Sequence, residues 1–423
     1  MKKLVKMLKI NILFAAVLSL CFCFVFSACT GGDNTDNGGN SGVADGGGNN
    51  GGNNGEENPP IEQPEEKIAA NNDYSNPIYP LHGGEKTPVY TADPYVLRGD
   101  DGYFYLYCTQ TEVFLNDSAM GRTFKRGPVF KSPDCVNWVY TADVFENYTP
   151  DWVSPVNGNN PGVWAPTVVK VGEYYNFYYS FSVGNYDNPE IGIGVARSST
   201  PYGPWQHYGK LFNSGEIGVI NSIDPHVLWD DGKLYMVFGS YGGLITLVEL
   251  EADGLSLKGG LEYQKEHKTA LAGYERYEME NYEASIILKR DGKYYLFLST
   301  GATLSGTKST YHVVVATSDN IAGPYVDSRG RNMFGPNRGD YVITPSMSGA
   351  MGVGHMCLVG DDAGAVWMLY HGYDTKGGNT AEWRVLYLDK LLWSESGLPY
   401  VKDSHASNHE VLPGPYLNAL EEN

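Results

Sequence analysis

Five glycine turns recur along the chain, and each is followed by a short run rich in aromatic residues. The glycines are Gly102, Gly172, Gly232, Gly292 and Gly364, at intervals of 70, 60, 60 and 72 residues. Self-similarity at a fixed period is typical of repeated supersecondary units. Runs of Tyr, Val, Ile and Phe between Asp-Gly and Gly-Pro turns predict strands, and no long stretch has helical periodicity. The sequence therefore predicts an all-β chain, a five-bladed β-propeller in one domain.

The repeat also predicts which side chains meet. Positions eight or nine residues before the turn glycines are Asp93, Trp164, Asp224, Glu283 and His355. If the segment before each turn is the innermost strand of a blade, these positions converge on the central axis, and one pocket holds three carboxylates. A two-sheet sandwich is the alternative architecture, but it does not account for a repeat of 60 to 72 residues.

The N-terminus predicts export. In residues 1–28 four lysines precede an apolar stretch, which is the order of a secretory signal peptide. The sequence Phe-Ser-Ala-Cys that ends at Cys29 resembles a bacterial lipobox, so we expect a lipoprotein held by lipidated Cys29 at the cell surface or facing the periplasm. An uncleaved membrane anchor is the alternative, since the apolar stretch approaches the ~20 residues that span a bilayer. Residues 29–75 are rich in Gly, Asn and Asp and predict a disordered linker, and residues 76–423 the propeller.

Charge and cysteine content limit the partners. The formal net charge is -19, and loss of the four signal-peptide lysines makes it -23, which argues against nucleic acid as a partner. We expect a monomer that meets a polysaccharide and touches the membrane only through its lipid. Cys108, Cys135 and Cys357 fall in the propeller segment, where at most one disulfide can form. We expect all three to be small buried apolar residues.

Three acids around one axis allow a specific chemistry. Mutual repulsion and burial should raise at least one carboxyl pKa toward neutrality, so that a proton donor and a base coexist. Hydrolysis of a glycosidic bond needs this pair: one carboxyl protonates the leaving oxygen and one carboxylate acts on the opposite face of the sugar. The sequence contains no nucleophile elbow, no Walker phosphate loop and no paired-cysteine zinc spacing.

The segments around these acids carry a family resemblance. They are Thr91-Ala92-Asp93-Pro94-Tyr95-Val96, Val163-Trp164-Ala165-Pro166, Asn221-Ser222-Ile223-Asp224-Pro225 and Tyr282-Glu283-Ala284-Ser285. Together with Gly239-Ser240-Tyr241, Gly354-His355 and Tyr370-His371-Gly372-Tyr373-Asp374, they resemble the blade motifs of glycoside hydrolase family 43, and its arabinanase branch fits best. One departure is Thr167, where the family usually has an acid after Trp-Ala-Pro.

The resemblance implies an inverting mechanism. Asp93 is then the general base, Glu283 the general acid, and Asp224 the group that orients Glu283 and raises its pKa. The resemblance also implies residues that line the sugar subsite: Trp164, Gly184, Asn221, Ser240 and Tyr241. Trp164 as plain core packing is the alternative.

The same resemblance places His355 beside a central calcium ion, with water completing the shell, because calcium prefers oxygen ligands. A hydrogen-bonded histidine that plugs the axis is the alternative for His355.

These observations predict hydrolysis of internal α-1,5-linked arabinofuranosyl bonds in arabinan. An end-acting arabinofuranosidase or a β-xylosidase on the same scaffold is the alternative within the class. A surface lipoprotein that binds polysaccharide without cleaving it is the alternative from another class, since a propeller rich in aromatics suits binding too. The presence of all three acids argues against that second alternative.

Overall fold

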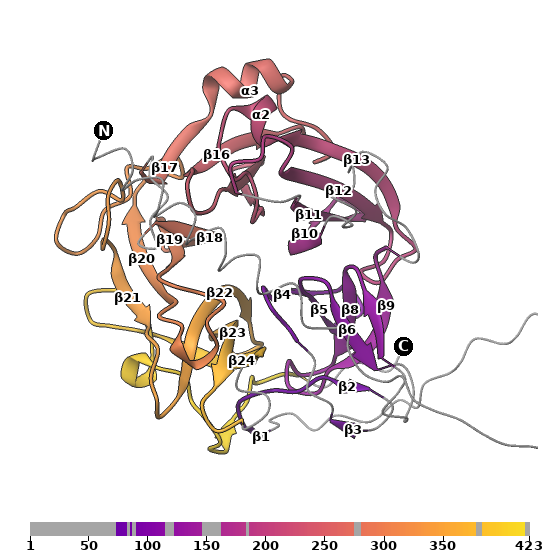
Figure 1. Ribbon diagram of the computed structural model, residues 1–423, viewed down its shortest axis with the longest axis vertical. Coiled ribbons are helices and arrows are strands. Elements are labelled where there is room, and N and C mark those ends of the chain that lie inside the picture. Colours follow the sequence, from indigo (N-terminus) through magenta and orange to yellow (C-terminus); the bar gives the residue numbers. More distant parts are fainter. Residues whose placement is uncertain are drawn as a thin grey trace, which may run out of the picture. The chain divides into compact units, whose positions relative to one another are not determined.

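The computed structural model describes residues 73–82, 85–86, 90–114, 122–145, 162–182, 186–274, 281–377 and 383–418. Within these residues five β-sheets stand around a central axis, so the predicted five-bladed propeller is confirmed (Figure 1). Residues 1–72, which include the predicted signal peptide, Cys29 and most of the linker, lie outside the described residues. Gly184 does too.

Blade 1 is the most elaborate sheet. From the axis outward its strands are β4 (Tyr95–Arg98), β5 (Phe104–Tyr107), β8 (Pro128–Ser132) and β9 (Val139–Asp143). β2 (Leu81–His82) pairs with β9, and β3 (Glu85–Lys86) pairs with β2. The hairpin of β6 (Thr111–Phe114) and β7 (Arg122–Lys125) lies between β5 and β8 in the chain.

The other four blades are antiparallel four-stranded sheets with strands in chain order. Blade 2 contains β10 (Gly162–Val171), β11 (Tyr174–Ser182), β12 (Gly192–Ser198) and β13 (Gln206–Asn213). Blade 3 contains β14 (His226–Asp230), β15 (Lys233–Phe238), β16 (Leu244–Leu250) and β17 (Thr269–Gly273). Blade 4 contains β18 (Tyr282–Arg290), β19 (Lys293–Thr300), β20 (His312–Ser318) and β21 (Asp340–Ile343). Blade 5 contains β22 (Ala350–Gly360), β23 (Val366–Asp374), β24 (Arg384–Trp393) and β25 (Pro399–Val401).

Among the residues that the structure describes, helices are short and lie in the connections. They are α2 (Ser214–Ile217), α3 (Leu261–His267) and the 3-10 turns η1 (Gly306–Lys308) and η3 (Lys402–Ser404). Each inner strand contacts the inner strands of its two neighbouring blades, and β22 contacts β4, so the ring of blades closes.

The N-terminal segment fastens the first blade to the last. β1 (Asp73–Tyr74) pairs with β26 (Leu412–Pro413) near the C-terminus. The Asn76 side-chain amide forms the two hydrogen bonds that a neighbouring strand would form with β24. Its Nδ2 donates to the Leu388 carbonyl at 2.8 Å, and its Oδ1 accepts the Leu388 N–H at 2.9 Å. Ile78 N–H then donates to the Leu386 carbonyl at 2.8 Å. Buried backbone groups on β24 thus obtain the partners that they need.

The five turn glycines join the first and second strands of the blades, as predicted. Their φ angles lie between 62° and 80°, in the left-handed region that is costly for residues with a Cβ. A Cβ on Gly172, Gly232, Gly292 or Gly364 would meet no atom within 4 Å. The backbone conformation, and not crowding, therefore requires glycine at these turns.

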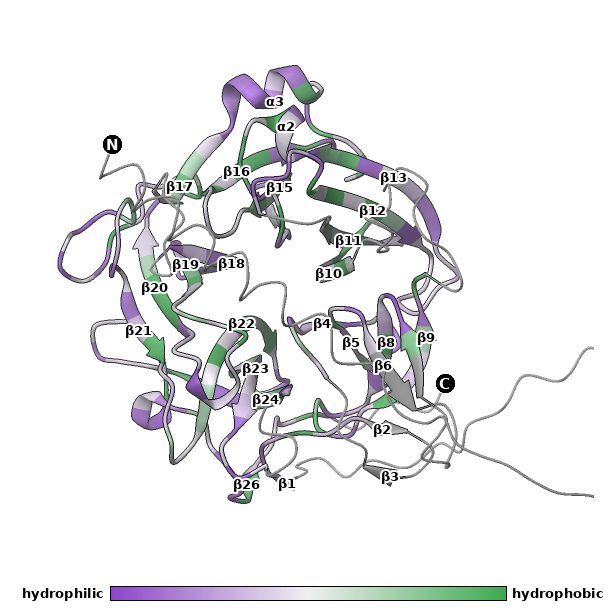
Figure 2. Cartoon of the chain, in the orientation of Figure 1, coloured by the Kyte–Doolittle hydropathy of each residue, from purple (hydrophilic) through white to green (hydrophobic). Residues whose placement is uncertain are grey.

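Five apolar clusters form the core, and each lies between two adjacent blades. In β5, Phe104 and Leu106 pack toward blade 5, whereas Tyr105 and Tyr107 pack toward blade 2. Alternate residues of a strand point to opposite faces, so a strand with a blade on either side is apolar along its whole length. In Figure 2 the strands β12, β16 and β20 are accordingly green over much of their length, while α3 is largely purple. Burying one such side chain contributes about 1.5–3 kcal/mol.

Cys108, Cys135 and Cys357 are free thiols and are buried, as expected from the sequence. Among the described residues no helix is both long enough and apolar enough to cross a membrane.

Candidate active site

At the top of every inner strand, either within the strand or two residues before it, lies a non-glycine residue in the left-handed conformation. These residues are Asp93, Ala165, Asp224, Ala284 and His355, with φ between 41° and 58°. In blades 2, 4 and 5 the pairing with the second strand shifts at this point, which is a β-bulge. Trp164 and Glu283 stand one residue before the left-handed position, so the five predicted positions are not strictly equivalent.

Side chains from the preceding blade bind the backbone N–H groups of four of these left-handed residues. Thr109 Oγ1 accepts the Ala165 N–H at 2.8 Å, and Ser180 Oγ accepts the Asp224 N–H at 2.9 Å. Ser299 Oγ accepts the His355 N–H at 3.0 Å in the same way, and His371 Nδ1 accepts the Asp93 N–H at 3.1 Å. Each bond joins the end of a second strand to the next inner strand. Since a buried N–H without a partner is costly, this ring of bonds fixes the tops of the inner strands.

Blade 4 departs from this rule. The Ala284 N–H donates to Asp224 Oδ2 at 3.2 Å instead of to a hydroxyl. Ser240, the corresponding hydroxyl residue, donates to Glu283 Oε2 at 2.8 Å. One carboxylate thus supports the backbone next to Glu283, and the hydroxyl is available to the Glu283 carboxyl itself.

Asp93 is surrounded by hydrogen-bond donors. Thr109 Oγ1 donates to its Oδ2 at 2.6 Å, and Arg384 Nη1 donates to its Oδ1 at 3.2 Å. His355 Nδ1 lies 3.2 Å from the same Oδ1. Burial raises the pKa of Asp93, but His355, Arg384 and His371 together outweigh burial and hold that pKa well below its usual value. Asp93 is therefore a carboxylate near neutral pH.

Glu283 has the opposite character. Burial raises the pKa of Glu283 to about 7, with hydrogen bonds from Tyr311 and Ser240 opposing this rise and the charge of Asp93 adding to it. The Tyr311 hydroxyl donates to Glu283 Oε1 at 2.7 Å. The two carboxyl oxygens are thus held by separate donors, and the group carries a proton in a large fraction of molecules at neutral pH.

Asp224 is the third acid at the hub. Its pKa lies well above the usual value, first because the side chain is buried and then because Glu283 and Asp93 place negative charge nearby. The ionisation of Asp224 therefore depends on the charge state of Glu283. The three carboxyl groups act on one another electrostatically, so the structure brings together the three acids that the repeat predicted.

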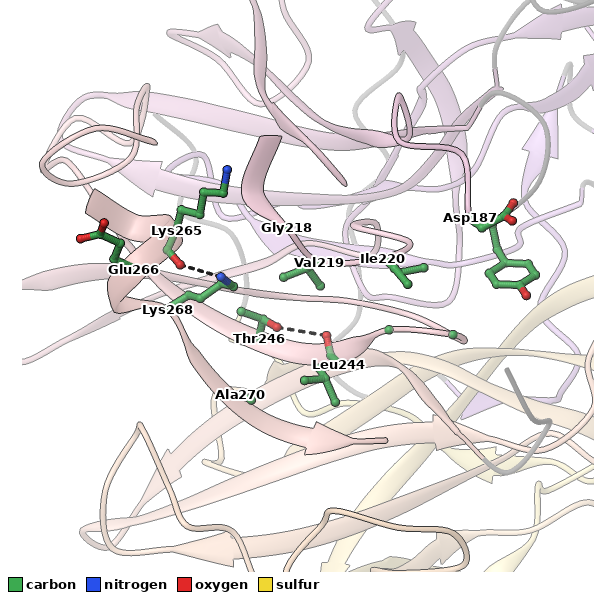
Figure 3. A pocket seen from close by; sticks show the side chains of 13 residues that line it. Asp187, Gly218, Val219, Ile220, Leu244, Thr246, Lys265, Glu266, Lys268 and Ala270 are labelled. Atoms are coloured by element: carbon green, nitrogen blue, oxygen red, sulfur yellow. Dashed lines mark hydrogen bonds between the residues drawn. The ribbon is translucent and has the colours of Figure 1, made fainter. Parts of the chain in front are cut away.

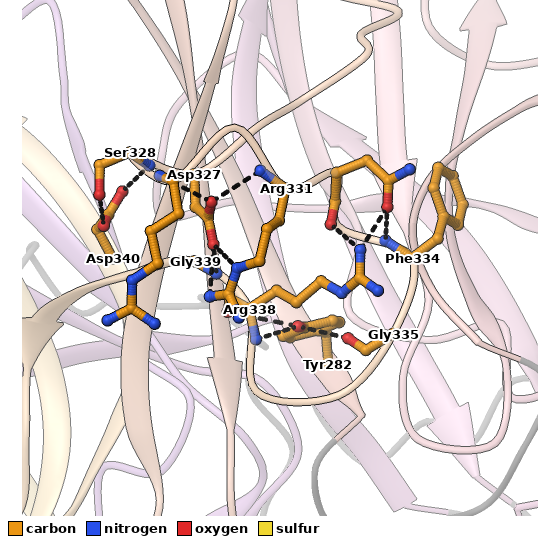
Figure 4. Close-up of polar contacts among 11 residues, drawn as sticks. Tyr282, Asp327, Ser328, Arg331, Phe334, Gly335, Arg338, Gly339 and Asp340 are labelled. Atoms are coloured by element: carbon orange, nitrogen blue, oxygen red, sulfur yellow. Dashed lines mark hydrogen bonds and ion pairs between the residues drawn. The ribbon is translucent and has the colours of Figure 1, made fainter.

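The loop between β20 and β21 holds the backbone just before Glu283 (Figure 4). The Tyr282 hydroxyl donates to the Gly335 carbonyl at 2.9 Å and accepts the Arg338 N–H at 3.1 Å. The loop is itself closed by Asp327, which binds the Arg331 guanidinium at 2.6 Å. Tyr282 is fully buried, so this arrangement fixes the start of β18.

The other predicted residues that the structure describes lie in or next to blades 2 and 3. The half-buried Trp164 indole lies against Gly162, where a Cβ would come within 2.2 Å of the ring nitrogen. Asn221 Nδ2 donates to the Tyr241 carbonyl at 3.0 Å, and the Tyr241 hydroxyl donates to the Gly301 carbonyl at 2.7 Å. Asn221 and Tyr241 thus link blade 3 to blade 4 at the hub.

His355 has one ring nitrogen that could bind a metal ion. Burial lowers its pKa, so the ring is neutral, and a proton on Nδ1 facing Asp93 leaves the lone pair on Nε2. That nitrogen is one donor suited to a metal. The described part of the chain contains no group of three or more His, Cys, Asp or Glu residues able to hold an ion, so a calcium ion here would take its other ligands from water.

Thr167 lies in the layer beneath the carboxyl groups, two residues after the left-handed Ala165, and is fully buried. The equivalent positions in blades 1 and 3 are Tyr95 and His226, whose ring centroids are 6.4 Å apart. Thr167, the residue that departs from the family pattern, is therefore part of the packing between inner strands and not one of the residues at the carboxyl groups.

Four residues around the acids were missed as site residues: Thr109, Tyr311, His371 and Arg384. A signal exists for two of them, because a hydroxyl or imidazole residue follows each turn glycine by seven or eight positions. These positions are Thr109, Ser180, Ser240, Ser299 and His371. Tyr311 and Arg384 have no counterpart in other blades, so the repeat gives no indication of them.

Comparison with known proteins agrees with this geometry. The profile of glycosyl hydrolases family 43 matches residues 86–399. An extracellular exo-alpha-(1→5)-L-arabinofuranosidase of Cellvibrio japonicus is 29% identical over 325 residues, which cover 72% of this chain and 91% of that protein. An extracellular endo-alpha-(1→5)-L-arabinanase of Bacillus subtilis is 28% identical, covering 66% and 81%. The solved structure of a Cellvibrio cellulosa alpha-L-arabinanase complexed with arabinohexaose superposes with a TM-score of 0.62 at 27% identity, covering 76% of this chain and 99% of that one.

Proposed function

Since the chain belongs to glycosyl hydrolases family 43 and is a glycosidase, we propose that it hydrolyses internal α-1,5-L-arabinofuranosyl linkages of arabinan with inversion. One observation carries the proposal: the same hub holds a carboxyl group whose pKa is raised to about 7 and a carboxylate whose pKa is held low. Inverting hydrolysis requires such a pair on opposite faces of the sugar.

In this proposal Glu283 is the general acid that protonates the leaving glycosidic oxygen. Asp93 is the general base that takes a proton from the attacking water, and its ionised state under Arg384 and His355 suits that role. Asp224 positions Glu283 because its Oδ2 accepts the Ala284 N–H, and the charge of Asp93 helps to raise the pKa of Glu283. Protonation and water attack then occur without a covalent intermediate.

The sugar subsite is proposed to lie over the same residues. Trp164 offers a flat aromatic face to an arabinofuranose ring. Asn221 and Tyr241 shape the adjacent wall, and Gly184 completes the set implied by the family. Ser240 acts through Glu283, because its hydroxyl already donates to that carboxyl group.

We further propose an exported lipoprotein anchored through Cys29, and water-mediated calcium beside His355. The two relatives described above are named extracellular enzymes, which supports export. No step of the proposed reaction depends on the metal.

Two matched pairs of variants test the chemistry. Glu283→Gln and Asp93→Asn should each remove nearly all turnover of linear arabinan while the circular dichroism spectrum stays unchanged. Glu395→Gln and Asp319→Asn make the same chemical changes at exposed positions and should retain full activity. Turnover at the wild-type rate in either hub variant would remove that residue from the mechanism.

Product sizes distinguish internal from terminal cleavage. A ladder of oligosaccharides in the first minutes of arabinan hydrolysis is expected. Arabinose alone would instead favour the end-acting activity that the Cellvibrio japonicus relative has by name.

A further inference from the structure

A cavity of about 670 Å³ lies at the boundary of blades 2 and 3, and none of the three hub acids lines it. Its walls come from the segments before β12, between α2 and β14, between β15 and β16, and around the C-terminal end of α3. Figure 3 shows the lining side chains spread in a row from Glu266 and Lys265 on α3 to Asp187 at the other end. Cavities of ~300–1,000 Å³ are typical of small-molecule sites.

The cavity shares a wall with the proposed sugar subsite. Ile220, which lines the cavity, immediately precedes Asn221, and Gly242 immediately follows Tyr241. The two segments are joined by the bond from Asn221 Nδ2 to the Tyr241 carbonyl. They are also in close contact, because a Cβ on Gly243 would lie 2.0 Å from the Ile220 carbonyl oxygen. The proposed subsite and the cavity are therefore bounded by the same two segments of the chain.

The lining suits a neutral saccharide. Ile220 is 50% exposed and offers an apolar surface, with Val219 and Leu244 beside it. Sugar rings present apolar C–H faces as well as hydroxyl groups, and pockets for such ligands combine an apolar surface with a few polar groups.

The charges that line the cavity balance. Lys265 and Lys268 are matched in number by Glu266 and Asp187. Lys268 Nζ donates to the Lys265 carbonyl at 2.6 Å, and neither lysine forms an ion pair with a carboxylate among the residues that the structure describes. Both ammonium groups can still donate to hydroxyl groups. An acidic polysaccharide would instead require a net positive lining.

We propose that this cavity is a second saccharide-binding site, which holds the arabinan chain beyond the residues at the site of cleavage. The proposal rests on the function proposed above. Its occupant is a neutral α-linked pentofuranosyl chain, and its effect is to bind long substrates more tightly than short ones. Because such contacts are the same in the ground state and the transition state, they lower KM and leave kcat unchanged.

The test compares linear arabino-oligosaccharides from the trimer to the octamer. With the wild-type protein, KM should fall about tenfold from the shortest to the longest substrate. Ala270→Trp fills the cavity from β17, and Ile220→Asp places a charge on its apolar wall; either should remove this fall while kcat and the trimer KM stay unchanged. Ile220→Asp also covers the case in which Ala270→Trp fails to fold. Val411→Asp, at a 71% exposed position before β26, is the matched control and should behave as wild type.

The outcomes are distinguishable from failure of the proposed function. A wild-type KM that does not depend on length, or a length dependence that both cavity variants retain, would overturn the proposal. If no oligosaccharide is hydrolysed, the proposed function fails. Calorimetric titration of the octamer into wild-type protein and the two cavity variants then tests whether the cavity binds saccharide. Binding that Ala270→Trp or Ile220→Asp weakens about tenfold supports the site, and absent or unaffected binding rejects it.

Discussion

Tyr311→Phe should move the alkaline limb of the pH–activity profile to higher pH. The Tyr311 hydroxyl donates to Glu283 Oε1 at 2.7 Å and lowers the pKa of Glu283, which burial has raised to about 7. Glu283 must be protonated to act as the acid, so activity falls as pH rises through its pKa. Without the donor the ionised form loses stabilisation, the pKa rises, and the protonated form persists to higher pH.

The size of the shift follows from one hydrogen bond. A bond to a charged group contributes about 1.5–3 kcal/mol, and the lower end applies because Glu283 keeps its bond from Ser240. Since a shift of one pKa unit corresponds to about 1.4 kcal/mol, the alkaline limb should move up by about one unit.

The assay is kcat/KM on arabinotriose between pH 4 and 10. Tyr325→Phe is the matched control, because Tyr325 is a buried tyrosine of blade 4 whose hydroxyl donates to the Ile321 carbonyl and not to Glu283. Its profile should follow that of the wild type. An unchanged alkaline limb in Tyr311→Phe, or a shift to lower pH, would refute the reasoning.

Three further changes probe the hub and its support. Arg384→Met removes a cation that lowers the pKa of Asp93, so the acidic limb of kcat/KM should move to higher pH; a limb that stays in place contradicts the assigned role. Ser180→Ala leaves the buried Asp224 N–H without its partner and should lower the free energy of unfolding in urea by about 1–3 kcal/mol, and a cost near zero would mean that the inter-blade bond is dispensable. Gly292→Ala, at φ 76° in open space, should cost about 1–2 kcal/mol in the same assay, and no loss would show that the turn tolerates a Cβ.

The propeller could be predicted from the sequence because each repeat contains a turn whose backbone conformation requires glycine. Gly102 and its four counterparts occupy left-handed turns that other residues avoid, so the turns recur visibly even where the strands differ. The same period brought Asp93, Asp224 and Glu283 together, since equivalent tops of inner strands can only meet at the axis.

The other contacts of the three acids could not be predicted, because they depend on local backbone geometry that the spacing of residues in the sequence does not reveal. The bulge at Ala284 places Glu283 one position before the left-handed residue, and this shift allows Ser240 to reach the Glu283 carboxyl. Tyr311 and Arg384 come from a loop and from a third strand, and only the packing of blades 4 and 5 brings them to the acids.

The stereochemistry of the first product tests the central claim most directly. Proton NMR during the first turnovers of an α-1,5-linked arabino-oligosaccharide reports the anomer released before mutarotation. If Asp93 activates water on the face opposite to Glu283, the new reducing end should appear as the β-anomer. Initial release of the α-anomer would mean retention through a covalent intermediate, and would contradict the account of the hub as an acid–base pair.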